Sequence, residues 1–217
     1  MKYWSTGSAL LVTLTLCSFN SFAEQQKSWS VELAADAIWA STKINDVRDE
    51  DDTLPSFYAD IEHDIAYVPN FRLRYTGIDT AKLQHDKTDF TFYWRPLRTE
   101  NLLFDAGFTL SNYANSYFEY NTHINGDFDD TVFSWFAAMG IRVPSTNLHV
   151  ISEFDFADTT SMKSTDLTVG AHYDIPLDKV SLGLRGGYRV LDYVLKDFGD
   201  KPYGFAHGWY AGASIKF

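Results

Sequence analysis

The sequence lacks the cysteine pairs that would form disulfides, because Cys17 is the only cysteine among 217 residues. Positive charge is also scarce, with 18 Lys and Arg against 29 Asp and Glu and a net charge of −11. Nucleic acid is therefore not an expected partner, since its phosphates require clustered basic residues. Without disulfides, an exported domain of this size has to be stabilised by strand pairing and packing, or by a membrane.

Long hydrophobic runs are missing as well. The apolar stretch 9–16 is shorter than the roughly 18 residues that a membrane-spanning helix requires. With Lys2 before it and Ser21 and Ala23 after it, this stretch is typical of a secretory signal peptide. We expect residues 1–23 to be removed, leaving residues 24–217 as one domain. Cys17 raises the alternative of a lipoprotein acylation site, but the preceding residue is leucine, where lipoprotein processing prefers a small side chain.

Aromatic residues are abundant, at 17% of the chain, although the mean hydropathy is −0.23. Over most of the chain apolar and polar residues alternate with the period of two that is typical of β-strands. In residues 102–111, for example, Phe104 and Phe108 fall on one face while Asp105 and Thr109 fall on the other. The alternation predicts strands throughout and no amphipathic helix.

Two kinds of connection alternate along the chain. Four are tight turns that usually carry proline, and five are looser and more polar. The expected strands are 29–40, 57–66, 71–77, 88–95, 102–111, 132–143, 148–156, 165–175, 179–193 and 203–217. Strands of about 9–11 residues are long enough to cross a bilayer. The pattern predicts an all-β fold, a single up-and-down antiparallel transmembrane β-barrel of ten strands, with eight strands as the alternative.

Alternation alone does not decide which face of the barrel contacts lipid. A soluble, lipocalin-like barrel places its apolar side chains inside. The apolar set here is rich in rings, and a ten-stranded barrel has too little interior to hold them. We therefore expect the apolar face outward, with aromatic girdles at both rims. Those expected near the short-turn rim are Phe71, Trp94, Tyr173 and Phe217, and those expected near the outer rim are Trp39, Phe57, Tyr113 and Phe205.

The last strand carries a separate signal. It ends in Phe217, with Ile215 and Trp209 at alternate positions before it. This pattern resembles the C-terminal strand of outer-membrane proteins, which the barrel-assembly machinery recognises. Recognition by that machinery and by periplasmic chaperones is therefore expected, together with a location in the outer membrane of a Gram-negative cell.

The polar face carries charges of both signs, which are expected to form a network in the lumen. Its predicted members are Glu62, Arg72, Arg74, Glu153, Asp155, Asp174, Arg185 and Arg189. Because strands joined by a short turn pair with each other, Glu62 is expected to meet Arg72, and Asp174 to meet Arg185. Two interpretations remain open. The network either fills a small barrel as a packed polar core, or lines a narrow path that favours cations.

Motifs of known chemistry are not recognisable. The sequence contains neither Gly-x-Ser-x-Gly nor His-Glu-x-x-His. We therefore predict no enzyme, with no catalytic residues, no cofactor and no metal site. His123, in a loop with Asp127, Asp129 and Asp130, leaves a membrane-embedded hydrolase as a further alternative. The acidic runs 46–52 and 125–130 are dense enough to bind Ca²⁺ or Mg²⁺, although solvated charge is the simpler interpretation.

Residues 67–79, with the sequence YVPNFRLRYTGID, resemble a segment of a gammaproteobacterial outer-membrane protein family. In that family a Pro-Asn turn opens a strand of the form x-Arg/Lys-Leu-Arg-Tyr-Thr-x-x-Asp. Residues 88–94 and 103–110 resemble its next two strands, and the terminal strand agrees too. The family is named for its co-occurrence in genomes with proteins that carry a Gly-Gly C-terminal sorting tail cut by rhombosortase. The resemblance implies an outer-membrane barrel, without an activity and without catalytic residues.

The sequence as a whole predicts a monomeric outer-membrane barrel with a structural or surface-binding role. Its expected surroundings are the lipid bilayer and lipopolysaccharide. A narrow cation-leaning channel or porin is the alternative, and an outer-membrane hydrolase is the third interpretation.

Overall fold

The computed structural model describes residues 29–45, 47–121 and 124–217, and within them the side chains of all but residues 50, 121 and 124. The predicted signal peptide, residues 1–23, lies outside the described residues. No helix in the described ranges is long and apolar enough to span a membrane.

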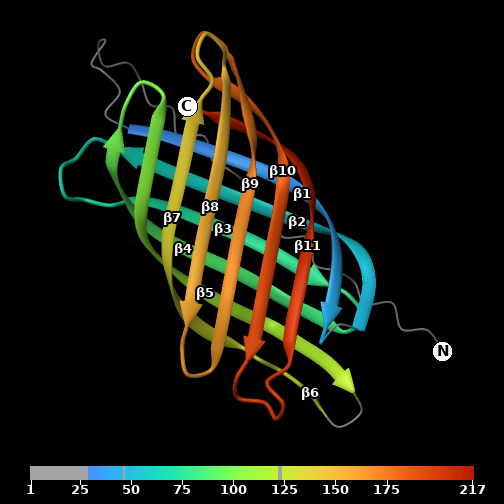
Figure 1. Cartoon of the computed structure of the whole chain (residues 1–217). Helices are drawn as coiled ribbons and strands as arrows, with labels where there is room; N and C mark the ends of the chain where they lie inside the picture. Colours follow the sequence, from blue (N-terminus) through green and yellow to red (C-terminus); the bar gives the residue numbers. More distant parts are fainter. Residues whose placement is uncertain (1–28, 46, 122–123) are drawn as a thin grey trace, which may run out of the picture.

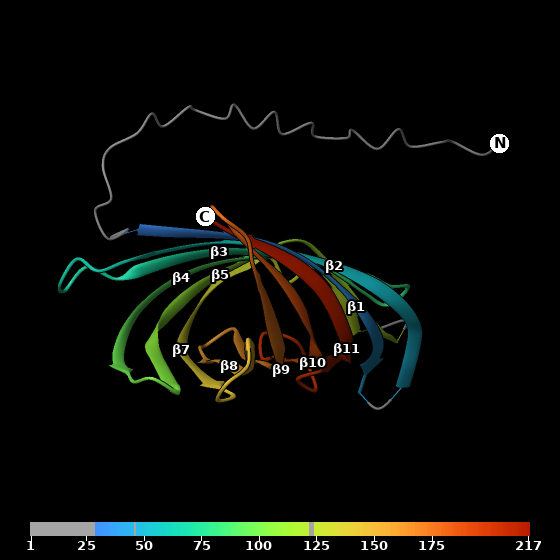
Figure 2. The same ribbon diagram turned by 90° about the horizontal axis from the view of Figure 1, so that it is seen from above.

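Ten antiparallel strands form a closed barrel, as the sequence predicts. The strands of the ring are β1 (Trp29–Ile44), β2 (Val47–His63), β3 (Asn70–Asp79), β4 (Leu83–Arg98), β5 (Leu102–Asn121), β7 (Asp130–Arg142), β8 (Leu148–Asp158), β9 (Met162–Pro176), β10 (Ser181–Leu195) and β11 (Tyr203–Lys216). Neighbours in sequence are neighbours in the wall, and β1 pairs with β11 to close it. The start of β1 and the C-terminus lie at the same end (Figure 1), and the strands curve around one interior (Figure 2).

The strands are longer than predicted, mainly at the end opposite the short turns. The predicted loop 41–56 consists almost entirely of strand, because β1 runs to Ile44 and β2 begins at Val47. The predicted loop 77–87 shrinks to the turn between Asp79 and Leu83. These boundaries were wrong because each strand continues beyond its apolar residues. The polar residues that follow still pair their backbones with the neighbouring strand.

An eleventh, very short strand also departs from the prediction. This strand, β6 (Ile124–Gly126), pairs with the end of β5 and does not complete the ring. It lies within the predicted loop 112–131, most of which is strand because β5 continues to Asn121. The ring itself still has ten members.

The outer face of the barrel is apolar and the inner face is polar over most of its height. Exposed outward-facing side chains include Phe90, Trp94, Phe104, Phe133, Trp135 and Phe154. Buried inward-facing side chains include Asp60, Arg74, Lys87, Asp89, Asp155, Asp166 and Arg189. This arrangement is the inverse of a soluble barrel, which would hide its rings and expose its charges.

The interior changes character toward the end opposite the short turns. There the inward positions become apolar and form one buried cluster, called the apolar plug. It is built from Ile38, Ala40, Ile44, Leu54, Ile78, Leu83, Tyr113, Phe118, Phe128, Val132, Ala157, Met162, Leu191, Tyr193, Leu195, Ala206 and Tyr210. Every strand of the ring contributes at least one residue, so the plug fills the barrel across its whole section.

Tyr113 corrects one prediction about the outer girdle. It is 1% exposed and lies inside the barrel, within the apolar plug. Strand β5 continues through it, and alternation therefore places Tyr113 on the same face as the buried Thr109 and Ser111. Two other residues predicted for the outer girdle, Trp39 and Phe57, do lie on the outer face, where they are 55% and 51% exposed.

Candidate functional site

A cluster of three cations and three carboxylates occupies the middle of the lumen. This central charge cluster consists of Arg74, Lys87, Asp89, Asp155, Asp166 and Arg189. Its members come from β3 and β4 on one side of the ring and from β8, β9 and β10 on the other, so they meet across the lumen. All six side chains are at most 7% exposed.

Asp166 is the most heavily bonded carboxylate of the central charge cluster. Arg189 donates to both of its oxygens, with Nη2 2.7 Å from Oδ2 and Nε 2.9 Å from Oδ1. Nζ of Lys87 lies 2.9 Å from Oδ2, and Nη2 of Arg74 lies 3.4 Å from the same atom. A buried carboxylate needs this number of donors, because an unpaired charge in a low-dielectric interior is costly.

Hydroxyl groups complete the bonding of the other two carboxylates. Thr109 donates to Oδ1 of Asp155 at 2.5 Å, and Ser111 donates to Oδ1 of Asp89 at 2.6 Å. Arg189 uses its remaining nitrogen to donate to the hydroxyl of Thr76 at 3.1 Å. The polar groups are fixed by several partners each, which gives a rigid interior.

A second group of charges lies between the central cluster and the short-turn end. Arg72 donates to Asp60 at 2.7 Å and to Glu153 at 2.5 Å. Glu153 also accepts from Arg74 at 3.2 Å, which links this group to the central charge cluster. The hydroxyl of Tyr93 donates to Asp60 at 2.8 Å.

Glu62 and Arg72 do not form the predicted pair. The β2–β3 register places Asp60 opposite Arg72, and Glu62 instead accepts from Arg95 at 2.7 Å and Lys216 at 3.0 Å. The prediction was wrong by two residues along β2. A two-residue shift keeps every side chain on the same face, so alternation cannot detect it.

The predicted pair of Asp174 and Arg185 is wrong for the same reason. The β9–β10 register places Gly183 opposite Asp174, and His172 opposite Arg185. Asp174 lies 2.9 Å from Nε2 of His149 and 3.3 Å from Nε2 of His172. Arg185 forms an ion pair with Asp36 instead, with Nη1 3.3 Å from Oδ2. Its guanidinium carbon lies over the ring of Tyr58, 4.5 Å from the ring centroid.

Little open space remains beside the central charge cluster. The cavity next to Arg185 measures about 10 Å³ and is also lined by Asp36, Thr168 and Tyr210. That is the size of about one water molecule. The interior at this height is therefore filled by side chains, whereas nearer the short turns a cavity of about 260 Å³ lies beside Arg72, His149 and Glu153.

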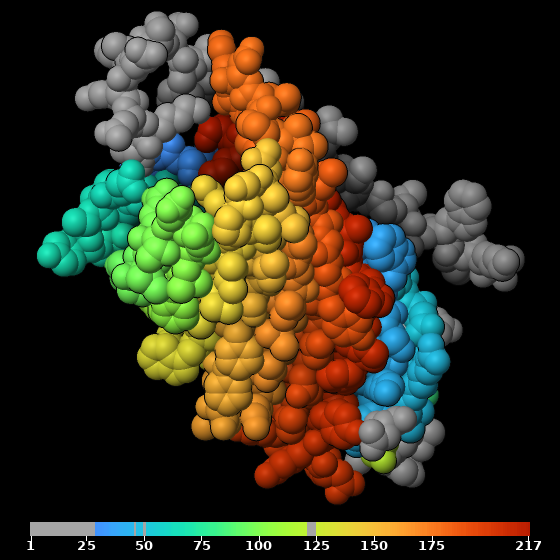
Figure 3. All heavy atoms as spheres, turned by 45° about the horizontal axis from the view of Figure 1, so that its top comes forward, coloured from blue at the N-terminus to red at the C-terminus, as the bar shows by residue number. Residues whose placement is uncertain are grey.

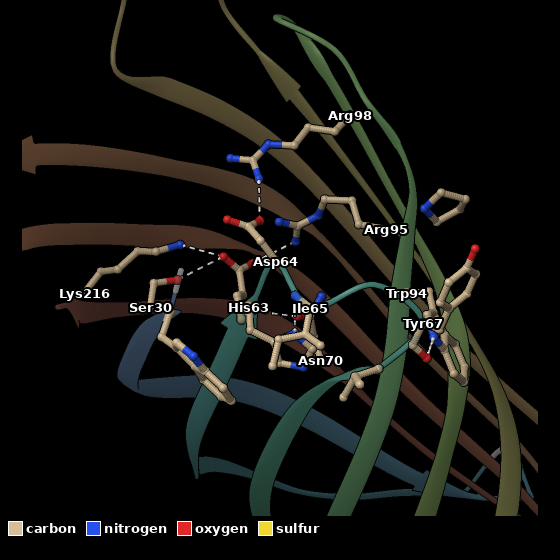
Figure 4. Close-up of a pocket in the computed structure, with 14 residues that line it drawn as sticks. Ser30, His63, Asp64, Ile65, Tyr67, Asn70, Trp94, Arg95, Arg98 and Lys216 are labelled. Atoms are coloured by element: carbon tan, nitrogen blue, oxygen red, sulfur yellow. Dashed lines mark hydrogen bonds and ion pairs between the residues drawn. The ribbon is translucent and has the colours of Figure 1, made fainter. Parts of the chain in front are cut away.

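At the short-turn end the interior opens into a wide hollow of about 860 Å³. Trp29, His63, Trp94, Arg95 and Lys216 are among the residues that line it (Figure 4). The surface is visibly recessed at this end, where the start of β1 and the end of β11 lie below the surrounding turns (Figure 3). Arg95 lines the hollow and is held in place by hydrogen bonds to Asp105 at 2.7 Å and to Glu62.

The opposite end is closed by the apolar plug and by a segment that folds over it. Phe128 is 7% exposed, and its backbone N–H donates to the hydroxyl of Ser116 at 2.7 Å. The backbone N–H of Ser116 in turn donates to Asp129 at 2.9 Å. Hydrogen bonds from the Ser116 side chain and backbone lower the pKa of Asp129 below its ordinary value. Part of the acidic run 125–130 therefore holds this closing segment in place.

No group of three or more His, Cys, Asp or Glu within the described ranges is placed to hold a metal ion. His123, on which the hydrolase alternative depends, lies outside the described residues. The residues brought together in the lumen are instead fixed acid–base pairs. Such an arrangement stabilises a barrel, and the cavity beside the central charge cluster has room for about one water molecule.

Lys87, Arg95 and Lys216 are members of the network that the sequence prediction omitted. Lys87 was assigned to a loop, although its side chain is 2% exposed in the lumen. A signal was present in the sequence, since inward positions continue at every second residue from Leu83 to Arg95 through β4. The predicted members Arg74, Glu153, Asp155 and Arg189 are all in the connected network.

The strand that was predicted to carry an assembly signal closes the barrel. Ile215 pairs with Leu33, and the backbone N–H of Phe217 donates to the carbonyl of Val31 at 2.9 Å. Trp209 projects outward and is 68% exposed. Its recognition by assembly machinery stays a prediction.

No family model matches the chain, and no curated protein matches it. Among solved structures, the outer membrane protease OmpT from Escherichia coli is 9% identical over 88% of this chain and 96% of its own, with a TM-score of 0.43. The translocator domain of autotransporter NalP from Neisseria meningitidis is 12% identical over 90% of each chain, with a TM-score of 0.41. The Acinetobacter baumannii outer membrane protein Omp33 is 10% identical over 87% of this chain and 97% of its own, with a TM-score of 0.29. At these values the fold of this chain rests on its own strand pairing.

Proposed function

We propose that this protein is an integral outer-membrane β-barrel with a closed lumen and a structural or surface-binding role. The proposal includes export by the signal peptide, assembly as a monomer by the barrel-assembly machinery, and a place among lipopolysaccharide. It also includes membership of the family that residues 67–110 resemble. The proposal assigns no catalytic reaction to the barrel.

The inverted barrel supports insertion in a membrane. Its rings face outward, where Trp135 and Trp209 are 66% and 68% exposed, while buried charges face inward. In water such a surface would expose far more contiguous apolar area than soluble monomers tolerate. In a bilayer the same surface contacts lipid, and the closed ring leaves no open sheet edge facing the lipid.

The filled lumen is the single observation that carries the closed-barrel function. The central charge cluster joins opposite walls, and the apolar plug follows it along the barrel axis. A hydrated ion would have to part several buried ion pairs and then cross an apolar region. Both barriers act against conduction, so the interior supports a structural role over a cation-leaning channel.

Planar-bilayer recording tests this function. We expect purified, heat-modifiable protein to insert without steady conductance steps, while a general porin in the same bilayers conducts. Reproducible single-channel steps that scale with salt concentration would overturn the closed lumen. A chain that stays soluble and monomeric without detergent would overturn the membrane barrel itself.

A further inference from the structure

Two tryptophans lie side by side on the outer wall. Trp39 of β1 and Trp209 of β11 are cross-strand partners, and both are more than half exposed. Tyr188 of β10 packs edge-on against Trp209, with ring centroids 5.2 Å apart at 83°. The three strands are neighbours in the wall (Figure 1). These rings border a hollow of about 420 Å³ on the outer face, which none of the lumen charges lines.

Polar side chains line the same hollow on the side away from the short turns. Ser41 lies opposite His207 across β1 and β11, and opposite Asp51 across β1 and β2. Asp52 also lines the hollow. The hydroxyl of Tyr188 is hydrogen-bonded to Nδ1 of His207, which fixes the orientation of the imidazole.

On the opposite side of the tryptophans β1 and β11 carry small side chains, flanked by Phe57 of β2 and Leu184 of β10. There Ala37 lies opposite Ala211, and Ala35 lies opposite Ala213. Gly186 of β10 lies on the other side of Ala211. Larger side chains resume with Leu33 and Ile215. Going along the wall toward the outer end, the surface therefore changes from small apolar residues to aromatic rings and then to hydrogen-bonding groups.

This gradient matches a ligand that is apolar at one end and polar at the other. Tryptophan and tyrosine prefer the level of lipid headgroups, where one part of the ring is apolar and another is wet. Asp51 and Asp52 can accept hydrogen bonds from the hydroxyl groups of a sugar. Asp51 is paired with Arg48 at 2.6 Å, and neither Arg nor Lys is among the described residues that line the hollow, so a sugar fits it better than a phosphate. The apolar C–H face of a sugar ring packs well against an indole ring.

We propose that the hollow between Trp39, Trp209 and His207 binds the sugar headgroup of an outer-leaflet glycolipid, with its acyl chains along the alanine-lined wall below. The inference rests on the proposed membrane location. It names the ligand class of a surface-binding barrel, and it does not depend on whether the lumen conducts.

Native mass spectrometry of the full mature chain tests the site. The detergent is lauryldimethylamine oxide, because a maltoside would itself present a sugar. The probes are monoglucosyl diacylglycerol and phosphatidylglycerol with the same acyl chains. We expect saturable binding of the glycolipid, about tenfold weaker after Trp209→Ala or Trp39→Ala. The variant Trp39→Ala is included because Trp209 also belongs to the predicted assembly signal.

Trp135→Ala is the matched control. Trp135 is 66% exposed on β7, away from β1, β10 and β11 in the ring, and its loss should leave glycolipid binding unchanged. Tyr188→Phe removes the hydrogen bond to His207 but keeps the ring, so we expect weaker discrimination between the two lipids.

Three results would overturn the site. They are equal losses for Trp135→Ala and Trp39→Ala, phosphatidylglycerol binding as tightly as the glycolipid, and binding that never saturates. Heat-modifiable migration of every variant on a gel shows that the barrel is folded. A folded, bilayer-inserted protein without glycolipid binding refutes the site alone, whereas a chain that is soluble without detergent refutes the membrane location as well.

Discussion

Nζ of Lys87 on β4 lies 2.9 Å from Oδ2 of Asp166 on β9, across the lumen of the barrel. The two strands are not neighbours in either direction around the ring. The ion pair therefore joins opposite walls, and both side chains are at most 5% exposed. A link of this kind resists opening of the barrel and blocks a straight path through it.

Removal of one carboxylate tests the contribution of this link. Asp166→Asn leaves Lys87 and Arg189 without a full counter-charge in a buried place. We expect a loss of about 3–5 kcal/mol in the free energy of unfolding, measured by urea titration in detergent micelles. Asp178→Asn, in the exposed β9–β10 turn, is the control and should change little. A loss for Asp166→Asn no larger than that of the control would contradict the cross-lumen role.

The coupling between the two partners gives an independent measurement. Lys87→Met removes the opposite charge, so the double variant Lys87→Met/Asp166→Asn should lose less stability than the two single variants added together. We expect a difference of about 0.5–3 kcal/mol in the double-mutant cycle. Strict additivity would show that the two side chains do not interact.

Truncation of a ring inside the apolar plug should be costly. Phe118 is 0% exposed, and its ring lies 4.6 Å from that of Phe198. Phe118→Ala is expected to lower the free energy of unfolding by about 3–5 kcal/mol, because it leaves a cavity. Phe133→Ala is the comparison, since Phe133 faces outward at 41% exposure and lipid or detergent refills the space. Equal losses for both variants would argue against a packed plug.

Close packing around Gly183 predicts that a single added methyl group disturbs the short-turn end. A Cβ at this position would lie 2.1 Å from Nε2 of His172 and 2.3 Å from Oγ of Ser214. Gly183→Ala should cost about 1–3 kcal/mol in thermal or urea unfolding. Gly199→Ala, where a Cβ meets nothing within 4 Å, is the control. Because both clashing atoms belong to side chains, adding His172→Ala and Ser214→Ala should restore part of the loss, and no recovery would locate the strain elsewhere.

The hydrogen bonds to Asp129 predict a measurable acid titration. The pKa of Asp129 is lowered in the folded protein, first by the side chain and then by the backbone of Ser116. A carboxylate with a depressed folded pKa stabilises the fold above its unfolded pKa, and that contribution is lost as the pH falls through the folded pKa. Carboxyl-carbon NMR should give a midpoint for Asp129 below the ordinary value of 3.8. Ser116→Ala should move the midpoint upward, and an unchanged midpoint would contradict the assignment.

The sequence was sufficient to predict the barrel because alternation is a local property. Residues such as Phe104 and Asp105 project to opposite faces whichever strand they pair with. The even number of apolar–polar strands, the ring-rich outward face and the inward charges all follow from that pattern. The apolar plug was not predicted, because many of its members, such as Leu54, Leu83 and Phe118, lie in segments whose polar neighbours made them resemble loops.

The partners of the charges required the tertiary structure. Register across a hairpin depends on the exact geometry of the turn, and a shift by two residues keeps the same faces. Asp60 and Glu62 both lie inward on β2, yet Asp60 meets Arg72 while Glu62 meets Arg95 and Lys216. Pairs across the lumen are further removed from the sequence, since Lys87 and Asp166 are 79 residues apart.

The sequence by itself thus determined the all-β alternation, the ten-stranded ring, and which side chains face outward as the apolar set and inward as the polar set. Only the tertiary structure decided the register, the partners of each buried charge, the plug at one end and the tryptophan hollow on the outer wall. The physical reason is that side-chain direction along a strand is set by the local backbone. Which side chains meet is set by closure of the ring, which depends on all ten strands together.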